Sequence, residues 1–145
     1  MKDQSNQRIL ALDVGSHRVG MAISDPLGLT AQPLATLTRG AFKKDCAAIS
    51  SVIRDFGVEA VILGLPIDAE GNEGRQCEKV RFFADGLQTF LTEHNRILPF
   101  HFVDESYSSI EAENVLRKGN VGRHKKKKLI DKMAAAIILQ RYLTR

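Results

Sequence analysis

The spacing of hydrophobic residues along the chain predicts strands at its beginning. The runs Ile9–Val14 and Val19–Ser24 are mostly apolar, and the residues between them include Gly15, which indicates a β-hairpin. Leu34–Thr38 is predicted as a short third strand, because a loop containing two prolines and a glycine precedes it and disfavours helix. Three antiparallel strands are therefore expected to open the domain.

After Ala41 the spacing changes to that of helices. The first amphipathic helix is predicted from apolar residues at steps of four and three, with Gly57 as its C-cap: Phe42, Cys46, Ile49, Ile53 and Phe56. The second follows the polar loop Ile67–Gly74 and is predicted from a similar stripe: Val80, Phe83, Leu87, Phe90 and Leu91.

Two further apolar runs, Val58–Leu63 and Pro99–Val103, predict strands of the kind found in parallel sheets. A short helix is expected from Ser108 to Lys118, with Glu111 completing a capping box, and a last helix from about Lys128 to Tyr142. The order βββ-α-β-α-β-α-α predicts an α/β fold. Its central mixed sheet would have five strands, three antiparallel and then parallel ones, flanked by helices.

Length and composition favour one domain, residues 1–145. At 43% hydrophobic residues the chain can form a core without disulfides, and Cys46 and Cys77 lack the spacing of a zinc site. No stretch approaches the roughly 18 apolar residues of a membrane helix, and Met1–Gln7 lacks the apolar core of a secretory signal. We therefore expect a cytoplasmic protein with no membrane partner and with reduced, partly buried thiols.

The net charge of +4 is concentrated in one segment. Residues 117–128 hold seven Lys or Arg and no acid, so the rest of the chain has a formal charge of −3. Such a run is usually only a solvated or disordered segment. Six consecutive residues from Arg123 to Lys128, with His124 among them, nevertheless favour binding to a polyanion. The candidate contacts are Arg123, Lys125, Lys126, Lys127 and Lys128.

Four acids could carry chemistry, and each also has a structural explanation. Asp13 ends an apolar strand before Gly15 and could simply shape the turn. Asp104 and Glu105 end the last predicted strand and could instead cap the next helix; strand alternation would send one to each face of the sheet. Asp131 shares a helix face with Ala134, Ala135 and Ile138, or else only stabilises the start of that helix.

Together these acids supply the oxygen ligands that Mg²⁺ or Mn²⁺ prefers. Two ions about 4 Å apart could activate water and stabilise a leaving oxygen. We therefore predict Asp13, Asp104, Glu105 and Asp131 as metal ligands, and Asp13, Glu105 and Asp131 as catalytic residues. The four histidines have no ligand spacing, and the chain lacks a GxxxxGK[ST] phosphate loop and a GxSxG elbow.

Four motifs then identify a family. The run Leu-Asp13-Val-Gly15-Ser-His-Arg18-Val-Gly20, the Gly64-Leu65-Pro66 segment, the Asp104-Glu105 pair and the helix that begins Asp131-Lys-Met-Ala occur in register. They resemble the YqgF-type family of Holliday-junction-resolvase-like nucleases, which are linked to maturation of pre-ribosomal RNA. The resemblance implies a ribonuclease H-like fold with a divalent-metal site, two ions being its usual number, and adds Arg18, Gly64 and Pro66 to the expected nucleic-acid contacts.

The chain departs from the family pattern at two points. His17 stands where Lys is typical, and Ser106 begins a Ser-Tyr-Ser-Ser run where the family usually has Arg-Leu-Thr. Serine does not replace the bidentate grip of arginine on a phosphate. We therefore expect weaker substrate binding or slower turnover than in a relative with that Arg, and a gain from Ser106→Arg.

The resulting hypothesis is an endonuclease that processes the 5′ end of precursor 16S ribosomal RNA, with a pre-ribosomal particle as a further partner and a monomer or homodimer as the oligomeric state. Holliday-junction DNA is the alternative substrate, since the sequence has no discriminator for the 2′-hydroxyl. A non-catalytic RNA- or ribosome-binding module is a second alternative, and an actin-like ATPase a third, for which 145 residues supply only one of two domains.

Overall fold

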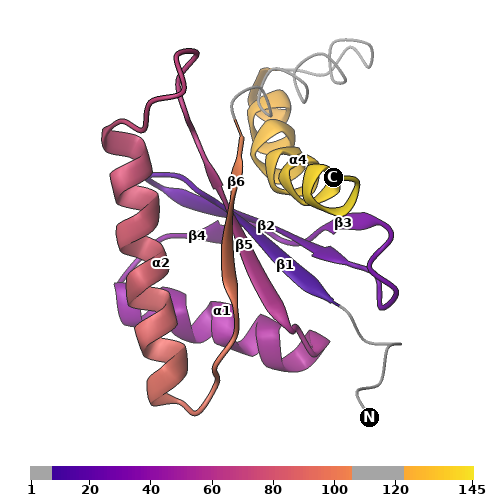
Figure 1. Cartoon of the computed structure of the whole chain (residues 1–145), viewed down its shortest axis with the longest axis vertical. Helices are drawn as coiled ribbons and strands as arrows, with labels where there is room; N and C mark the ends of the chain where they lie inside the picture. The colour runs from indigo at the N-terminus through magenta and orange to yellow at the C-terminus, as the bar shows by residue number, and fades with distance from the viewer. Residues whose placement is uncertain (1–7, 106–122) are drawn as a thin grey trace.

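A mixed sheet forms the centre of the protein in the computed structural model, which describes residues 8–105 and 123–145, without the side chains of 123–132 (Figure 1). In the described part the sheet has six strands, β1 (Ile9–Val14), β2 (Arg18–Ser24), β3 (Ala31–Pro33), β4 (Leu37–Thr38), β5 (Ala60–Leu65) and β6 (Phe100–Asp104). The helices are α1 (Phe42–Phe56), α2 (Arg75–Glu93) and α4 (Arg123–Leu143).

The strand order is β3-β2-β1-β5-β6, with β4 also paired to β2. β1 is antiparallel to β2 and parallel to β5, and β5 is parallel to β6. This confirms the predicted mixed sheet, in which an opening hairpin is continued by parallel strands. The third strand was predicted too long, because only its end, Leu37–Thr38, forms a strand (β4), and β3 lies before it, in the segment predicted as a loop. Both β3 and β4 pair with β2.

Helices cover both faces of the sheet, as strand alternation requires (Figure 1). Leu10, Leu12 and Val14 face the larger hydrophobic cluster, which contains buried residues of α1 and α2. Ala11 faces a smaller cluster in which Ala135, Ile138 and Leu139 of α4 pack on the sheet. The side chain at position 13 therefore points to the α4 face.

The first helix follows its predicted pattern closely. Cys46, Ile49 and Ile53 are buried, and Gly57 caps the helix in the left-handed conformation with φ 65°. At its other end, the buried Asp45 carboxylate accepts hydrogen bonds from the Gly40 backbone N–H at 3.1 and 3.3 Å. This carboxylate replaces the missing side-chain cap at Ala41.

Other boundaries differ from those predicted. β5 begins two residues after the predicted start and extends through Gly64 and Leu65, two residues beyond the predicted end, whereas α2 begins at Arg75, directly after the loop predicted to end at Gly74. α4 begins at Arg123, so the basic run 123–128 belongs to its first turns. The predicted helix Ser108–Lys118 and Ser106 lie outside the described residues.

Both cysteines are fully buried and unpaired, and burial raises the pKa of Cys46 to about 11, helped by the neighbouring Asp45 charge. These thiols therefore have the structural role that their spacing predicts.

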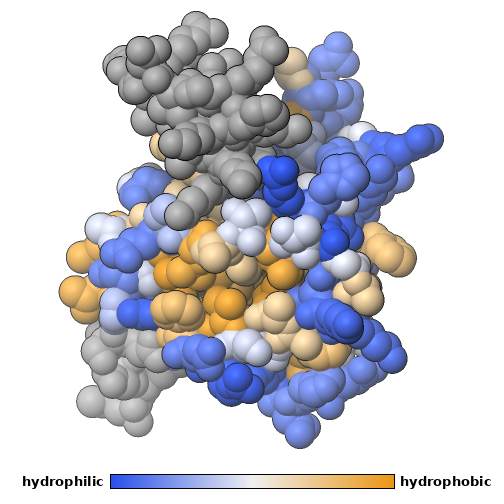
Figure 2. Space-filling model, turned by 180° about the vertical axis from the view of Figure 1, so that it is seen from behind, coloured by the Kyte–Doolittle hydropathy of each residue, from blue (hydrophilic) through white to orange (hydrophobic). Residues whose placement is uncertain are grey.

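Among the described residues no helix is long and apolar enough to cross a membrane. Seen from behind, hydrophobic residues gather towards the middle of the molecule and hydrophilic residues dominate its right-hand edge (Figure 2).

Candidate active site

The candidate site lies where the parallel strands end. The carboxyl ends of β5 and β6 and the beginnings of α2 and α4 meet at one edge of the sheet (Figure 1). Asp13 is the second-last residue of β1, pairs with Gly20 of β2 and is half-buried on the α4 face. This is the edge at which open α/β sheets usually bind ligands.

Strand alternation separates the two adjacent acids at the end of β6. Phe100 and Phe102 pack against the larger core, so Asp104 lies on that face and is exposed. Val103 packs with the α4 cluster, and Glu105, two residues later, lies on the same face and is half-buried. The Glu105 backbone N–H donates to the Leu65 carbonyl at 3.0 Å, which extends the register of β5 and β6 to this residue.

Asp13 and Glu105 form a carboxyl pair across the end of β5. Burial raises the pKa of Glu105 to about 9, together with the Asp13 charge and a side-chain hydrogen bond between the two groups. Asp104 raises this pKa further, and Arg141 partly opposes the increase. Without a cation, Glu105 therefore holds a proton at neutral pH and shares it with Asp13.

Gly64 creates the space for this pair. The last paired residues of β1 and β5 are Leu12 and Leu63, so Asp13 and Gly64 come next on the two strands. A Cβ on Gly64 would lie 2.6 Å from Ile138 Cδ1 and 2.8 Å from Glu105 Oε2. Gly64 is buried, so the geometry supports a packing role here rather than the nucleic-acid contact expected from its sequence.

The turn after Asp13 is held by residues that the sequence analysis missed. The Gly15 N–H donates to the Arg18 carbonyl at 2.8 Å, and a Cβ on Gly15 would lie 2.9 Å from that oxygen. Arg39 Nη1 donates to the Gly15 carbonyl at 2.7 Å, and Gln76 Nε2 to the Val14 carbonyl at 3.4 Å. These partners lie 24 and 62 residues away along the chain, and no local pattern indicates them.

Arg18 lies on the face of Asp13. Val19 packs into the larger core and Ala22 into the α4 cluster, so Arg18, Gly20 and Ala22 share the α4 side of β2. Arg18 is thus diagonal to Asp13 across the hairpin, a separation that a long side chain spans. Pro66 follows β5 at the same edge of the sheet and is half-buried.

The structure places Asp131 only by its backbone. Position 131 is one turn before the fully buried Ala135 in α4, on the helix stripe that continues to Ile138. The amino-terminal end of α4, which contains the basic run, lies beside the end of β6 (Figure 1). Contacts of Asp131 and of residues 123–128 lie outside the described side chains.

The donor set can be compared with the needs of a divalent cation. Two adjacent carboxyl groups, one kept protonated by burial and by the charge of the other, are oxygen donors that Mg²⁺ or Mn²⁺ would favour. Among the residues described with side chains, no three His, Cys, Asp or Glu gather in one place. A complete cation site therefore needs Asp131, substrate or water in addition to this pair.

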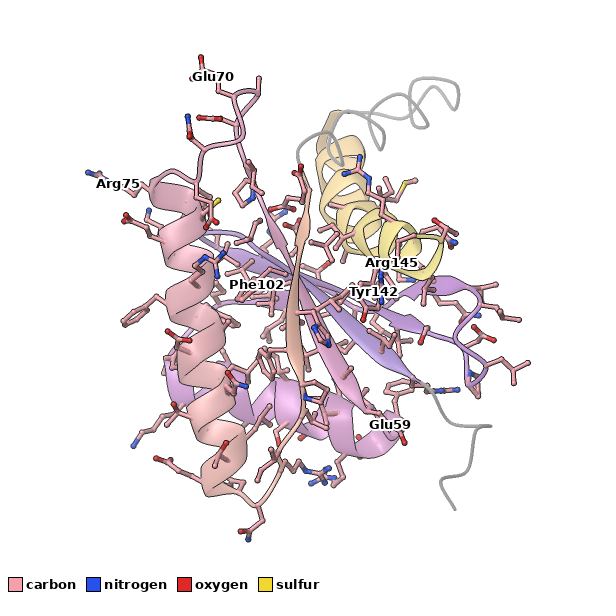
Figure 3. The ribbon with its side chains drawn as sticks, viewed as in Figure 1. Glu59, Glu70, Arg75, Phe102, Tyr142 and Arg145 are labelled. Carbon is pink, nitrogen blue, oxygen red and sulfur yellow. The ribbon has the colours of Figure 1, made fainter. Side chains whose placement is uncertain are left out.

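Two side chains labelled in Figure 3 mark the connection from β5 to α2. Arg75 extends outward from the beginning of α2, and Glu70 marks the tip of the loop after β5. This loop is the one predicted at Ile67–Gly74, and it is closed by the Asp68 carboxylate, which accepts hydrogen bonds from the Glu70 and Asn72 N–H groups. These hydrogen bonds hold the loop that connects the end of β5 to the start of α2.

Comparison with known proteins places the chain among nucleases. Residues 7–145 match the family described as RuvX: Holliday junction resolvase. A protein of Moorella thermoacetica is 43% identical over 138 residues, which cover 95% of this chain and 95% of that protein. One of Koribacter versatilis is 42% identical over 147 residues, covering 100% of this chain and 93% of that protein. Both carry the name "Putative pre-16S rRNA nuclease".

Solved structures confirm the expected ribonuclease H-like fold. T. thermophilus RuvC in complex with a Holliday junction substrate superposes with a TM-score of 0.58 at 15% identity, over 95% of this chain and 94% of that one. The Thermus thermophilus RuvC structure gives a TM-score of 0.53 at 15% identity, over 94% of each chain. At this identity the likeness shows a shared fold alone.

Proposed function

Because the chain belongs to the RuvX family of Holliday junction resolvases and is thus a nuclease, we propose that it is a divalent-metal-dependent endonuclease whose active site is built on Asp13 and Glu105. The single observation that carries this proposal is the carboxyl pair at the sheet edge. A protonated acid next to another acid is an unfavourable arrangement for stability alone, and a cation would remove the cost.

The residues have distinct tasks in this proposal. Asp13 and Glu105 hold Mg²⁺ or Mn²⁺, Asp131 completes the site from α4, and Asp104 on the opposite face supports the pair through its charge. A bound cation, or two, would supply Lewis-acid chemistry at the phosphodiester and lower the pKa of a water molecule. Arg18, Pro66 and the loop after β5 border the site and position the nucleic-acid backbone.

The substrate we favour is structured RNA, with the 5′ end of precursor 16S ribosomal RNA as the cleaved segment. The names of the relatives at 42–43% identity support this choice. Such a substrate would place the enzyme in the cytoplasm and near pre-ribosomal particles. Residues 123–128 at the start of α4 would contact phosphates without reading sequence.

Junction DNA is the second candidate substrate, supported by the family description and by the RuvC complex that shares this fold. The same metal chemistry cleaves either backbone. We expect a competition assay to separate the two, because a preferred precursor RNA leader would displace labelled RNA at lower concentrations than a four-way DNA junction does.

The test is cleavage of both end-labelled substrates by the wild type and by Asp13→Asn, with Mg²⁺, Mn²⁺ or EDTA. We expect metal-dependent products that the variant reduces by at least about 100-fold, with RNA binding retained. Asp55→Asn is the matched control, because Asp55 is an exposed acid in α1, and it should cleave like the wild type.

Separate substitution of the adjacent acids tests the assignment of roles. Glu105→Gln should impair cleavage as much as Asp13→Asn, whereas Asp104→Asn should impair it less, because Asp104 lies on the other face of the sheet. Binding without cleavage by the wild type in every metal would reject the nuclease and leave the non-catalytic binding module.

A further inference from the structure

A pocket of about 390 Å³ lies outside the carboxyl pair, between the start of α2 and the segment that leads into α1. Its volume is within the range of about 300–1,000 Å³ that small-molecule sites occupy. It lies on the α1 and α2 side of the sheet, since Phe83, which lines it, belongs to the larger hydrophobic core. The proposed catalytic function does not use this pocket.

Aromatic rings form the apolar part of the pocket. Phe83 is buried and forms its floor, and the Phe42 ring packs edge-on against it at a centroid distance of 5.4 Å. Phe82 is 80% exposed at the rim. A phenylalanine this exposed gains little from folding, but it offers a free ring face for stacking.

Three cationic side chains line the same pocket: Arg39, Arg75 and Lys79. The Arg39 guanidinium lies 5.2 Å from the centroid of the Phe83 ring, and Arg75 extends outward from the start of α2 (Figure 3). Glu78 is the one acid in the lining. Rings combined with an excess of positive charge match a nucleotide, whose base stacks and whose phosphate is anionic.

The pocket is physically connected to the active-site turn. Arg39 lines it and also donates to the Gly15 carbonyl at 2.7 Å. Gly15 is two residues after Asp13, which corresponds to roughly 7 Å of extended strand. The pocket and the carboxyl pair therefore lie on opposite sides of the turn that follows Asp13.

We propose that this pocket is a subsite for an unpaired nucleobase of a strand that passes the turn after Asp13, with Phe82 as the stacking platform and Arg75 and Lys79 as phosphate contacts. The proposal rests on the proposed nuclease function and adds that the substrate has a single-stranded segment that extends past the turn after Asp13. Glu78 can accept a hydrogen bond from an amino group of the base.

The experiment measures binding without cleavage. The probe is an RNA hairpin with an unpaired 5′ extension, titrated in EDTA and followed by fluorescence anisotropy. Phe82→Ala should weaken binding roughly 5- to 140-fold, because stacking of one base on an aromatic ring is worth about 1–3 kcal/mol and 1.4 kcal/mol is tenfold in affinity. A blunt hairpin without the extension should bind both proteins equally.

Two variants provide controls. Phe82→Tyr keeps the ring and should bind like the wild type. Ile97→Ala removes a side chain that is similarly exposed, at 84%, and that lies in the loop between α2 and β6, so it should change nothing. All three changes are at exposed positions, and thermal melts followed by circular dichroism should show unchanged folding.

Removal of single bases identifies the stacked nucleotide. One abasic position in the extension should weaken binding by the wild type but not further weaken binding by Phe82→Ala, because the two changes remove the same stacking interaction. Equal binding by Phe82→Ala and the wild type, or an abasic effect that persists in the variant, would overturn the subsite; the first result would point to a protein partner at Phe82. A DNA version of the probe shows whether the pocket distinguishes the two sugars.

The outcomes separate this proposal from the nuclease. A wild type that binds the extension through Phe82 but never cleaves would keep the subsite and reject the catalytic proposal. A wild type that cleaves through Asp13 while Phe82→Ala binds normally would do the reverse.

Discussion

At the scale of single residues, the properties of the site depend on a glycine as much as on the acids. Gly64 leaves the space into which Glu105 approaches Asp13, and Ile138 of α4 fills the rest of that space. The absence of a side chain at Gly64 of β5 therefore allows the two carboxyl groups to lie close together. Burial and the neighbouring Asp13 charge keep the Glu105 carboxyl protonated.

Substitution of Gly64 by alanine should disturb both neighbours. The new Cβ would lie within 2.6 to 2.8 Å of Ile138 Cδ1 and Glu105 Oε2, so we expect a decrease of about 1–3 kcal/mol in the free energy of unfolding and at least roughly tenfold slower cleavage. Urea unfolding and cleavage assays measure the two effects. Gly40→Ala is the control, since nothing lies within 4 Å of its Cβ position.

A second substitution separates stability from activity. Ile138→Val removes Cδ1, so in the Gly64→Ala background it should relieve the overlap in the core but leave the overlap with Glu105. The double variant should lose less free energy of unfolding than the sum of the losses in the two single variants, while its cleavage rate stays low. Recovery of cleavage to the wild-type rate would contradict the proposed role of Gly64.

The pair also predicts how stability depends on pH. The folded protein keeps the Glu105 proton up to about pH 9, whereas the unfolded chain releases it near pH 4.5, so the metal-free protein loses stability as pH rises through this interval. In EDTA, the Tm of the wild type should fall between about pH 5 and 9 by roughly 3 °C or more beyond that of Glu105→Gln.

Mg²⁺ should remove most of this difference at about pH 8, because a cation beside both carboxylates favours their ionised forms. Equal pH profiles of the wild type and Glu105→Gln in EDTA would show that Glu105 is not protonated in the folded protein. A wild-type profile that Mg²⁺ leaves unchanged would argue against a cation at the pair.

At the scale of elements, α4 is the component that completes the site. Small residues allow it to approach the sheet closely: Ala135 is fully buried and packs in one cluster with Ala11, Ala22 and Ile62. This close approach puts Ile138 against Gly64 and position 131 one turn nearer the sheet edge. The helix thus couples the packing of the core to the position of the third predicted acid.

Enlargement of the α4 contact should therefore impair activity from a distance. Ala135→Leu would push the helix away from the sheet, and we expect a decrease of about 1–3 kcal/mol in the free energy of unfolding and slower cleavage without any change to an acid. Ala47→Leu, at an exposed position of α1, should remain within about 0.5 kcal/mol of the wild type. Thermal melts and initial cleavage rates test both; normal cleavage by Ala135→Leu would remove α4 from the proposed site.

At the scale of the whole molecule, positive charge and acids are segregated along the chain and come together at one sheet edge. The basic run occupies the first turns of α4, beside the end of β6, while the remaining chain is formally negative (Figure 1). A polyanion attracted to this end of the molecule would therefore meet the carboxyl pair.

The monomer or homodimer expected from the sequence stays a prediction, which light scattering in solution can test.

The charge distribution predicts salt-dependent binding. With Lys125 to Lys128 replaced by Gln, affinity for RNA should fall, and the slope of log affinity against log salt should decrease by about 0.7–0.9 for each phosphate that a lysine no longer neutralises. The control is Lys43→Gln with Lys44→Gln, two exposed lysines of α1. An unchanged slope in the α4 variant would exclude the run from the interface.

The sequence by itself determined the opening hairpin, the alternation of helices and parallel strands from α1 to β6, and the first helix with its Gly57 cap. It also singled out the candidate acids. These follow from local properties, namely hydrophobic spacing, turn residues and the chemistry of carboxylates. It missed β3, made the next strand too long and began α4 too late, because strand ends depend on pairing partners and the polar first turns of a helix have no hydrophobic spacing.

Only the tertiary structure decided which acid faces Asp13. The choice between Asp104 and Glu105 depends on the residue at which β6 ends and on which core Phe102 and Val103 join. Tertiary structure alone also decided the close approach at Gly64, the Arg39 contact to Gly15 and the aromatic pocket, because the residues involved are distant in sequence. Contacts between elements arise from packing across the sheet, and a one-residue shift of register exchanges the faces of a strand.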